Sequence, residues 1–166
     1  TGAVIGGGMI GLLMLQLAKI KGASKLIMIE PIASKREQAK TLGADLVIDP
    51  FTEDVQTVLR EQGIARINTV IECVGKPSTV EQAIAIAGKK STVMMFGLTK
   101  PAETVAIKPF EIFKKEIVLK ASFINPYTQK RALELATLSC TYFLKAHSQC
   151  LILHSIVLMS GFSLNR

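Results

Sequence analysis

Three glycines near the start of the chain, Gly6, Gly8 and Gly11, have the spacing G-x-G-x-x-G. An apolar, β-prone run precedes them and a helix-forming run follows, and this context makes the pattern specific. The first glycine permits a sharp turn, the second lets a ligand approach the backbone, and the third lets the helix pack closely on the strand. The unpaired N–H groups at the helix start would attract a diphosphate. A glycine turn without a ligand is the alternative interpretation.

An acidic residue, Glu30, ends the next β-prone run. A carboxylate at this place accepts hydrogen bonds from both ribose hydroxyls of an adenosine, and it repels the extra 2′-phosphate of NADP. The sequence therefore predicts NAD as the cofactor. Lys35 and Arg36 follow closely, and a cation there could tolerate a phosphate, although a solvated helix surface is the alternative.

The elements that would position these residues alternate along the chain. Apolar runs predict strands at residues 1–6, 25–30, 46–49, 69–74, 91–96 and 117–124. Helical periodicity predicts helices at residues 8–21, 34–42, 53–62, 78–87 and 129–138. Two S-x-x-E patterns, Ser34/Glu37 and Ser78/Glu81, are typical of helix starts. This alternation predicts an α/β fold, namely a doubly wound, mostly parallel six-stranded Rossmann sheet with helices on both faces.

Ligands of such sheets lie across the carboxyl ends of the strands. The residues that follow the fourth and fifth expected strands would therefore border the same crevice as the glycine turn. Two glycines among them would keep the rim open for a flat ring, whereas the apolar residues could equally well belong to the core. These candidates are Cys73, Val74, Gly75, Phe96, Gly97 and Leu98.

Composition excludes several other classes of protein. The chain has 166 residues, of which 49 % are hydrophobic, so it can bury a single core. Its 20 basic and 13 acidic residues give a net charge of +7, but the basic residues are scattered and no nucleic-acid partner is predicted. No apolar run approaches the roughly 20 residues of a membrane helix. Three cysteines are too few for a disulfide framework, which favours a reducing, cytoplasmic setting.

No catalytic or metal-binding set is predicted. The C-terminal part holds four zinc-type side chains at an unfamiliar spacing, Cys140, His147, Cys150 and His154. No acidic residue follows Glu134 to orient a histidine. Glu72 could act as a general base, but a carboxylate satisfied by backbone N–H groups is the more ordinary interpretation. Cys73 has no identifiable activating group, so we expect a buried small residue rather than a nucleophile.

Residues 1 to about 138 resemble the coenzyme domain of zinc-dependent medium-chain alcohol dehydrogenases, particularly the sorbitol, threonine and butanediol dehydrogenase branch. The matching segments are VIGGGMIGLLMLQLAKIKGA, EPIASKREQAKTLGAD, VIECVGKPSTVEQAI, VMMFG and FKKEIVLKASFINP followed by KRALEL. The resemblance implies an NAD-binding domain over residues 1–138. Residues 139–166 depart from the family pattern and form a C-terminal segment of uncertain role.

The resemblance also implies roles for single residues. The backbone at Met9 and Ile10 would face the pyrophosphate, and Lys35 would assist Glu30 at the ribose. Val74 would touch the adenine side. The residues that would approach the nicotinamide end are Cys73, Phe96, Leu98 and Ser122.

The family's catalytic domain, which supplies the zinc, the proton relay and the substrate pocket, is absent from this sequence. We therefore expect the NAD-binding part of an enzyme that transfers hydride between a secondary alcohol or polyol and NAD, and a chain that binds cofactor without turnover. In the family the strand from Ile117 to Ile124 often pairs across a dimer, so a homo-oligomer is expected. The alternatives are a stand-alone dinucleotide-binding or sensing module and a relative of the zinc-free reductases.

Overall fold

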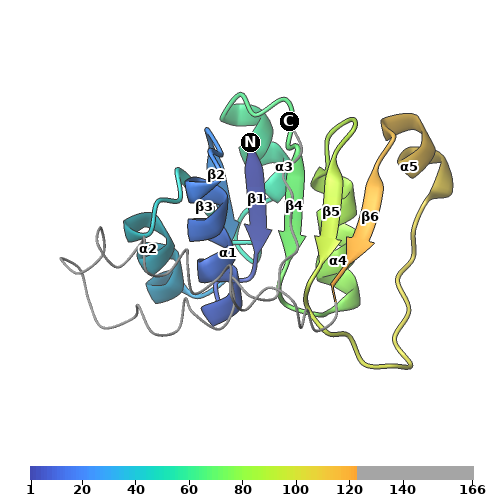
Figure 1. The fold of residues 1–166 in the computed structure, drawn as a ribbon, viewed down its shortest axis with the longest axis horizontal. Coiled ribbons are helices and arrows are strands. Elements are labelled where there is room, and N and C mark those ends of the chain that lie inside the picture. The colour runs from blue at the N-terminus through green and yellow to red at the C-terminus, as the bar shows by residue number, and fades with distance from the viewer. Residues whose placement is uncertain (123–166) are drawn as a thin grey trace. The chain divides into compact units, whose positions relative to one another are not determined.

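The computed structural model describes residues 1–122. Within them, six parallel strands form one sheet in the order β3-β2-β1-β4-β5-β6 (Figure 1). The α/β fold with a doubly wound Rossmann sheet is thereby confirmed. The strands are β1 (Gly2–Ile5), β2 (Leu26–Ile29), β3 (Leu46–Ile48), β4 (Thr69–Glu72), β5 (Thr92–Met95) and β6 (Val118–Ala121).

The strand order reverses at β1, which pairs with β2 on one side and with β4 on the other. The loops that leave β1 and β4 therefore diverge to opposite faces of the sheet. In open parallel sheets this reversal produces a crevice at the carboxyl ends of the strands, where ligands bind. The glycine turn directly follows β1 and so lies at this position.

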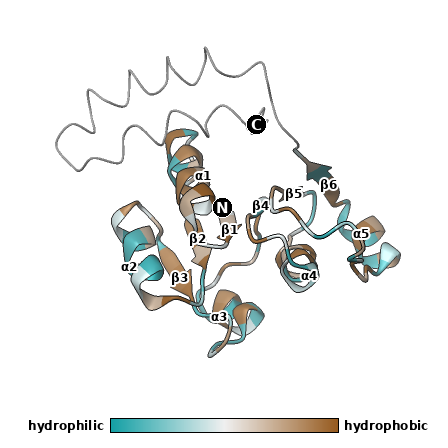
Figure 2. Cartoon of the chain, turned by 90° about the horizontal axis from the view of Figure 1, so that it is seen from below, coloured by the Kyte–Doolittle hydropathy of each residue, from teal (hydrophilic) through white to brown (hydrophobic). Residues whose placement is uncertain are grey.

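Helices cover both faces of the sheet. Figure 2 shows α1 and α2 on one face and α3 and α4 on the other. α1 is apolar on most sides, and every residue from Gly11 to Leu17 is buried. The helices are α1 (Met9–Ile20), α2 (Ala33–Thr41), α3 (Val55–Glu61), α4 (Pro77–Ile86) and α5 (Pro109–Lys115).

The core explains why the strands are continuously apolar. Ile27, Ile29, Val70 and Val93 are at most 1 % exposed, because helices cover both sides of the sheet. Such strands cannot alternate apolar and polar residues as a half-solvated sheet does. The apolar runs in the sequence therefore locate the strands well.

Two predicted helix starts are wrong. α2 begins at Ala33 with Ile32 as its N-cap, so Ser34 and Glu37 lie inside the helix and form no capping box. α4 begins at Pro77, where the fixed φ of proline suits the first helical position. The hydroxyl of Thr79, rather than that of Ser78, accepts a hydrogen bond from the backbone N–H of the preceding cap residue.

Several predictions fall beyond the described part of the chain. These are the end of the sixth strand at residues 123–124, the helix at 129–138, the boundary at 138 and the four zinc-type side chains. α5 begins at Pro109, where no helix is predicted from the sequence. No helix within residues 1–122 is long and apolar enough to cross a membrane.

Candidate functional site

The glycine turn joins β1 to α1 and leaves the start of that helix open. Gly6 has a φ of +96°, a conformation that favours glycine. Gly8 is the N-cap of α1, with no side-chain cap and no acidic residue in the first turn. A Cβ placed on Gly8 would meet nothing within 4 Å. The first N–H groups of α1 thus face open space, as an anion site at a helix start requires.

Glu30, directly after β2, lies against the glycine turn. Its Oε2 accepts a hydrogen bond from the backbone N–H of Gly7 at 2.6 Å, and its Oε1 accepts one from the N–H of Ile32 at 2.9 Å. A carboxylate has about four acceptor positions, so about two remain, one on each oxygen. Only 4 % of the residue is exposed, which leaves little of the carboxylate for a ligand to meet.

Arg36 is held by contacts within the protein rather than solvated on the helix surface. Its Nη1 donates hydrogen bonds to the carbonyl oxygens of Glu30 at 2.8 Å and Pro31 at 2.6 Å, and lies 3.0 Å from Oδ2 of Asp49. The side chain is 19 % exposed, so it is not a solvated surface group. Nothing in the sequence distinguishes Arg36 from the adjacent Lys35, because the contact with Asp49 depends on the pairing of β2 with β3.

Lys35 and Ser122 are less closely tied to the turn. The half-buried Lys35 has no side-chain partner among residues 1–122. Ser122 directly follows β6 in the chain, and β4 and β5 separate that strand from β1. The structure therefore gathers most of the predicted residues around β1, β2, β4 and β5.

Glu72, the last residue of β4, holds the next two loops together. The residue is fully buried, and its Oε1 accepts hydrogen bonds from the N–H groups of Val74 at 2.8 Å and Gly75 at 2.9 Å. Its carbonyl oxygen accepts from the N–H groups of Phe96 and Gly97, both at 2.9 Å. The backbone-satisfied interpretation thus holds for Oε1, whereas Oε2 has no partner among the described residues.

Close backbone contacts join these loops to each other and to the turn. A Cβ on Gly75 would lie 2.5 Å from the carbonyl oxygen of Leu98, and one on Gly6 would lie 2.6 Å from Cγ2 of Val74. Gly97 similarly lies against the backbone of Gly75. The loops after β1, β4 and β5 consequently form one continuous wall.

Cys73 lies in this wall as a half-buried residue, rather than the fully buried one that was expected, and its thiol is unreactive. Burial raises the pKa of Cys73 to about 12, and the neighbouring Glu72 carboxylate adds to the rise. At neutral pH almost no thiolate is present, so the side chain is a poor nucleophile and metal ligand.

Large apolar side chains are exposed along the carboxyl edge of the sheet. Val74 is 40 % exposed and Leu98 84 % exposed. The other members of this group are Met9, Ile32 and Phe51. Phe51, which follows β3, was not among the predicted site residues.

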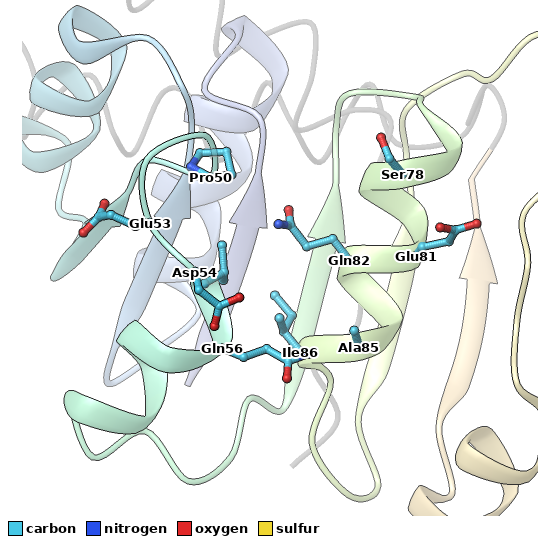
Figure 3. A pocket seen from close by; sticks show the side chains of 10 residues that line it. Pro50, Glu53, Asp54, Gln56, Ser78, Glu81, Gln82, Ala85 and Ile86 are labelled. Atoms are coloured by element: carbon cyan, nitrogen blue, oxygen red, sulfur yellow. The ribbon is translucent and has the colours of Figure 1, made fainter.

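A pocket between α3 and α4 contains none of the predicted residues (Figure 3). Its volume is about 370 Å³, and Glu53, Asp54 and Glu81 line it. Each of these carboxylates accepts a hydrogen bond from a backbone N–H group. Its negative charge would repel a diphosphate, so we do not assign the dinucleotide to it. No group of three or more metal-ligating side chains occurs within residues 1–122.

Comparison with known proteins gives consistent matches. Residues 9–138 match the family model described as zinc-binding dehydrogenase. A probable alcohol dehydrogenase of a Pseudomonas species is 37 % identical over 121 residues, which are 70 % of this chain and 37 % of that protein. The L-threonine 3-dehydrogenase of Pyrococcus horikoshii is 35 % identical over 67 % of this chain and 32 % of its own length. The chain thus spans about a third of these curated relatives.

Solved structures give the same result. A Sinorhizobium meliloti 1021 protein described as a zinc-binding dehydrogenase, bound to NADP, has a TM-score of 0.80 and 37 % identity, over 84 % of this chain and 42 % of that one. The 2R,3R-butanediol dehydrogenase of Bacillus subtilis has a TM-score of 0.74 and 26 % identity, over 81 % of this chain and 38 % of that one.

Proposed function

Because the chain belongs to the zinc-binding dehydrogenase family, we propose that its glycine turn and Glu30 bind the adenosine diphosphate part of a nicotinamide dinucleotide. The observation that carries this proposal is the position of Glu30, which is hydrogen-bonded to Gly7 of the turn beside the uncapped start of α1. A diphosphate and the sugar attached to it need an anion site and a ribose acceptor next to each other.

The residues present fit a diphosphate. The open space at Gly8 admits a ligand to the backbone, and the free N–H groups at the start of α1 supply donors and partial positive charge. Met9 and Ile10 provide two of these N–H groups. No carboxylate in the first helical turn competes for them.

The choice between NAD and NADP depends on Glu30. Its two remaining acceptor positions match the two hydroxyls of an adenosine ribose, and its negative charge opposes a 2′-phosphate. We therefore propose NAD, although the related Sinorhizobium protein was solved with NADP. We also propose that Arg36 does not bind a 2′-phosphate, because its Nη1 is held by two carbonyls and a carboxylate at the strand ends.

The exposed apolar wall supports the remainder of the cofactor. Val74 would contact the adenine side, and Leu98 with Phe96 and Cys73 would border the nicotinamide end, with Ser122 beyond them. When bound, the nicotinamide supplies hydride transfer at its C4. The role of this wall is to orient the ring and exclude water. Gly75 and Gly97 keep the wall close-packed beneath it.

We further propose that the whole enzyme oxidises a secondary alcohol or polyol or reduces the corresponding carbonyl, since relatives are named as alcohol and threonine dehydrogenases. The zinc and the substrate pocket would come from another part of the enzyme. The kinship with dehydrogenases disfavours the stand-alone sensing module. A reducing, cytoplasmic location fits the small, odd number of cysteines.

The edge strand β6 is the proposed contact between copies of the chain. Within residues 1–122 it pairs with β5 on one side only, and Val118 is 48 % exposed. Nearby α5 exposes Phe110 and Phe113. An unpaired apolar edge favours pairing with a second strand, so we propose a homo-oligomer.

Calorimetric titration of the full chain with NADH tests the binding proposal. We expect saturable binding in the micromolar to millimolar range, as is usual for such cofactors. The acidic α3–α4 pocket provides a control, because Glu81→Gln should leave the affinity unchanged. A folded chain that shows neither heat nor a thermal shift with NADH or NAD would contradict the proposal.

A further inference from the structure

We propose that Arg36 is a positioning residue that sets the preference between NAD and NADP by holding Glu30 in place. This inference rests on the proposed function of Glu30 as the ribose acceptor. Arg36 itself would not touch the cofactor. It would act through the backbone at the end of β2, which its guanidinium ties to the end of β3.

The contacts of Arg36 converge on the segment that carries the acid. Its Nη1 reaches the carbonyl oxygens of both Glu30 and Pro31, at 2.8 and 2.6 Å. The same nitrogen lies 3.0 Å from Oδ2 of Asp49, just beyond β3. One guanidinium therefore links two adjacent strand ends at the crevice.

Asp49 is itself held in a fixed position. Its Oδ1 accepts a hydrogen bond from the N–H of Phe51 at 3.0 Å, and its own N–H donates to Oε2 of Glu53 at 2.8 Å. The Arg36 and Asp49 side chains are 19 % and 15 % exposed, so solvent screens this pair less than an open surface pair. Asp49 can therefore act as a fixed anchor for Arg36.

The position of Glu30 matters because so little of it is accessible. With 4 % of the residue exposed and one acceptor position on each oxygen already used, a small displacement changes which groups a sugar can reach. Repulsion of a 2′-phosphate also requires the carboxylate to lie close to it, because the repulsion between like charges is strong only at short range. Releasing the Glu30–Pro31 carbonyls would allow the acid to move, which would weaken both effects.

Arg36 carries a positive charge, but its contacts tie it to the strand ends. Its Nη1 serves two carbonyls and a carboxylate, and these contacts would be lost if the side chain turned toward a phosphate. Lys35 beside it makes no such contacts among the described residues. The two adjacent cations consequently have different tasks.

The test measures dissociation constants for NADH and NADPH with the full chain and with Arg36→Gln. We expect the ratio of the NADPH dissociation constant to the NADH dissociation constant to fall about tenfold. The displaced Glu30 carboxylate would no longer repel the 2′-phosphate of NADPH. Lys40→Gln is the matched control. It removes the same charge from α2, but among residues 1–122 the Lys40 side chain pairs only with the exposed Glu37, so the ratio should stay within about twofold.

Two further variants separate positioning from general stability. Asp49→Asn should lower the ratio in the same direction, and adding it to Arg36→Gln should cause little further loss, since the two residues act as one pair. Arg36→Lys should restore the ratio only in part, because an ammonium lacks the planar set of donors. A purely structural role would weaken both cofactors equally and leave the ratio unchanged.

The outcomes distinguish this inference from the proposed function. If the wild-type chain binds NADH and the ratio is unchanged in both Arg36→Gln and Asp49→Asn, the role of Arg36 is refuted while dinucleotide binding stands. If the folded wild-type chain binds neither NADH nor NADPH, both proposals are refuted. A reduced ratio in Arg36→Gln and Asp49→Asn, with Lys40→Gln unchanged, supports the positioning role.

Discussion

The carbonyl oxygen of Gly6 occupies the space that a side chain on Gly11 would need. The absence of a side chain at Gly11 therefore lets the first turn of α1 lie close against the end of β1. By contrast, a Cβ on Gly8 would project into open space. Two glycines of one motif therefore have separable roles, one in packing and one in leaving room for a ligand.

Alanine substitutions should separate these roles. Gly11→Ala should destabilise the fold by about 2 kcal/mol or more, because the backbone of β1 or α1 must move to admit the methyl group. Gly8→Ala should fold with nearly unchanged stability, since its φ of −70° and ψ of 179° suit alanine. It should nevertheless weaken NADH binding about tenfold or more by blocking the approach to the backbone.

Urea unfolding and calorimetric titration of the two variants provide the measurements. Gly11→Ala with wild-type stability would show that the close contact is not maintained. Gly8→Ala with wild-type affinity for NADH would place the diphosphate elsewhere.

The Cys73 thiol should resist alkylation in the folded chain. Raising its pKa from 9.0 to about 12 lowers the thiolate fraction at pH 8 about a thousandfold. In a Cys140→Ser/Cys150→Ser background, iodoacetamide should therefore react far more slowly with the native chain than with the chain in urea. Equal rates in both conditions would contradict the raised pKa of this thiol.

The same pKa predicts a dependence of stability on alkaline pH. The folded state keeps the Cys73 proton up to about pH 12, whereas the unfolded chain releases it near 9.0. The contribution of the Cys73 thiol to the free energy of unfolding is thus fully present below pH 9 and is lost as the pH rises through about 12. Cys73→Ala should show a shallower loss of stability than the wild type over this range, and identical slopes would count against the prediction.

Asp54 should contribute stability that disappears in acid. Hydrogen bonds from Thr57 lower the pKa of the Asp54 carboxyl, which is the N-cap of α3. The contribution of Asp54 to the free energy of unfolding is therefore present above the pKa that Asp54 has in the unfolded chain. It is lost as the pH falls through the lower pKa that Asp54 has in the folded chain. Asp54→Asn should show a weaker acid dependence of the melting temperature, while Glu61→Gln in the same helix serves as the control. Superimposable acid profiles for Asp54→Asn and the wild type would argue against this cap.

A charge on the β6 edge should prevent association of chains. Val118→Lys places a cation on the exposed strand edge, where charged residues oppose strand pairing. Light scattering after size exclusion should show a larger assembly for the wild type and a smaller one for the variant. Lys120→Arg, which keeps the charge of the same strand, should behave as the wild type. A monomeric wild type at all concentrations would refute the proposed contact.

The strands and the crevice could be predicted because they follow from local sequence. A buried parallel strand needs a continuous apolar run, and a sharp turn followed by a close helix needs glycine. The helix starts were harder to predict. The N–H groups of Lys35 and Arg36 both donate to the carbonyl of Ile32, so α2 begins ahead of Ser34. Glu37 pairs with Lys40 instead of capping the helix.

The polar contacts that hold the site together could not be predicted in this way. Arg36 meets Asp49 only because β2 and β3 are neighbours in the sheet. Glu72 holds the loop after β5 only because β4 and β5 are paired. α5 was missed because Pro109 suggested a loop, although proline is favoured at the first position of a helix. Tertiary pairing, rather than local composition, decides each of these features.

The affinity for NADH and NADPH of Glu30→Ala, compared with the wild type by calorimetry, tests the central claim most directly. Hydrogen bonds to a charged group contribute about 1.5–3 kcal/mol, so NADH should bind at least about tenfold more weakly. The affinity for NADPH should fall little or even rise, because the negative charge that repels its 2′-phosphate is removed. A folded Glu30→Ala chain that binds both cofactors as the wild type does would show that this carboxylate does not hold the ribose.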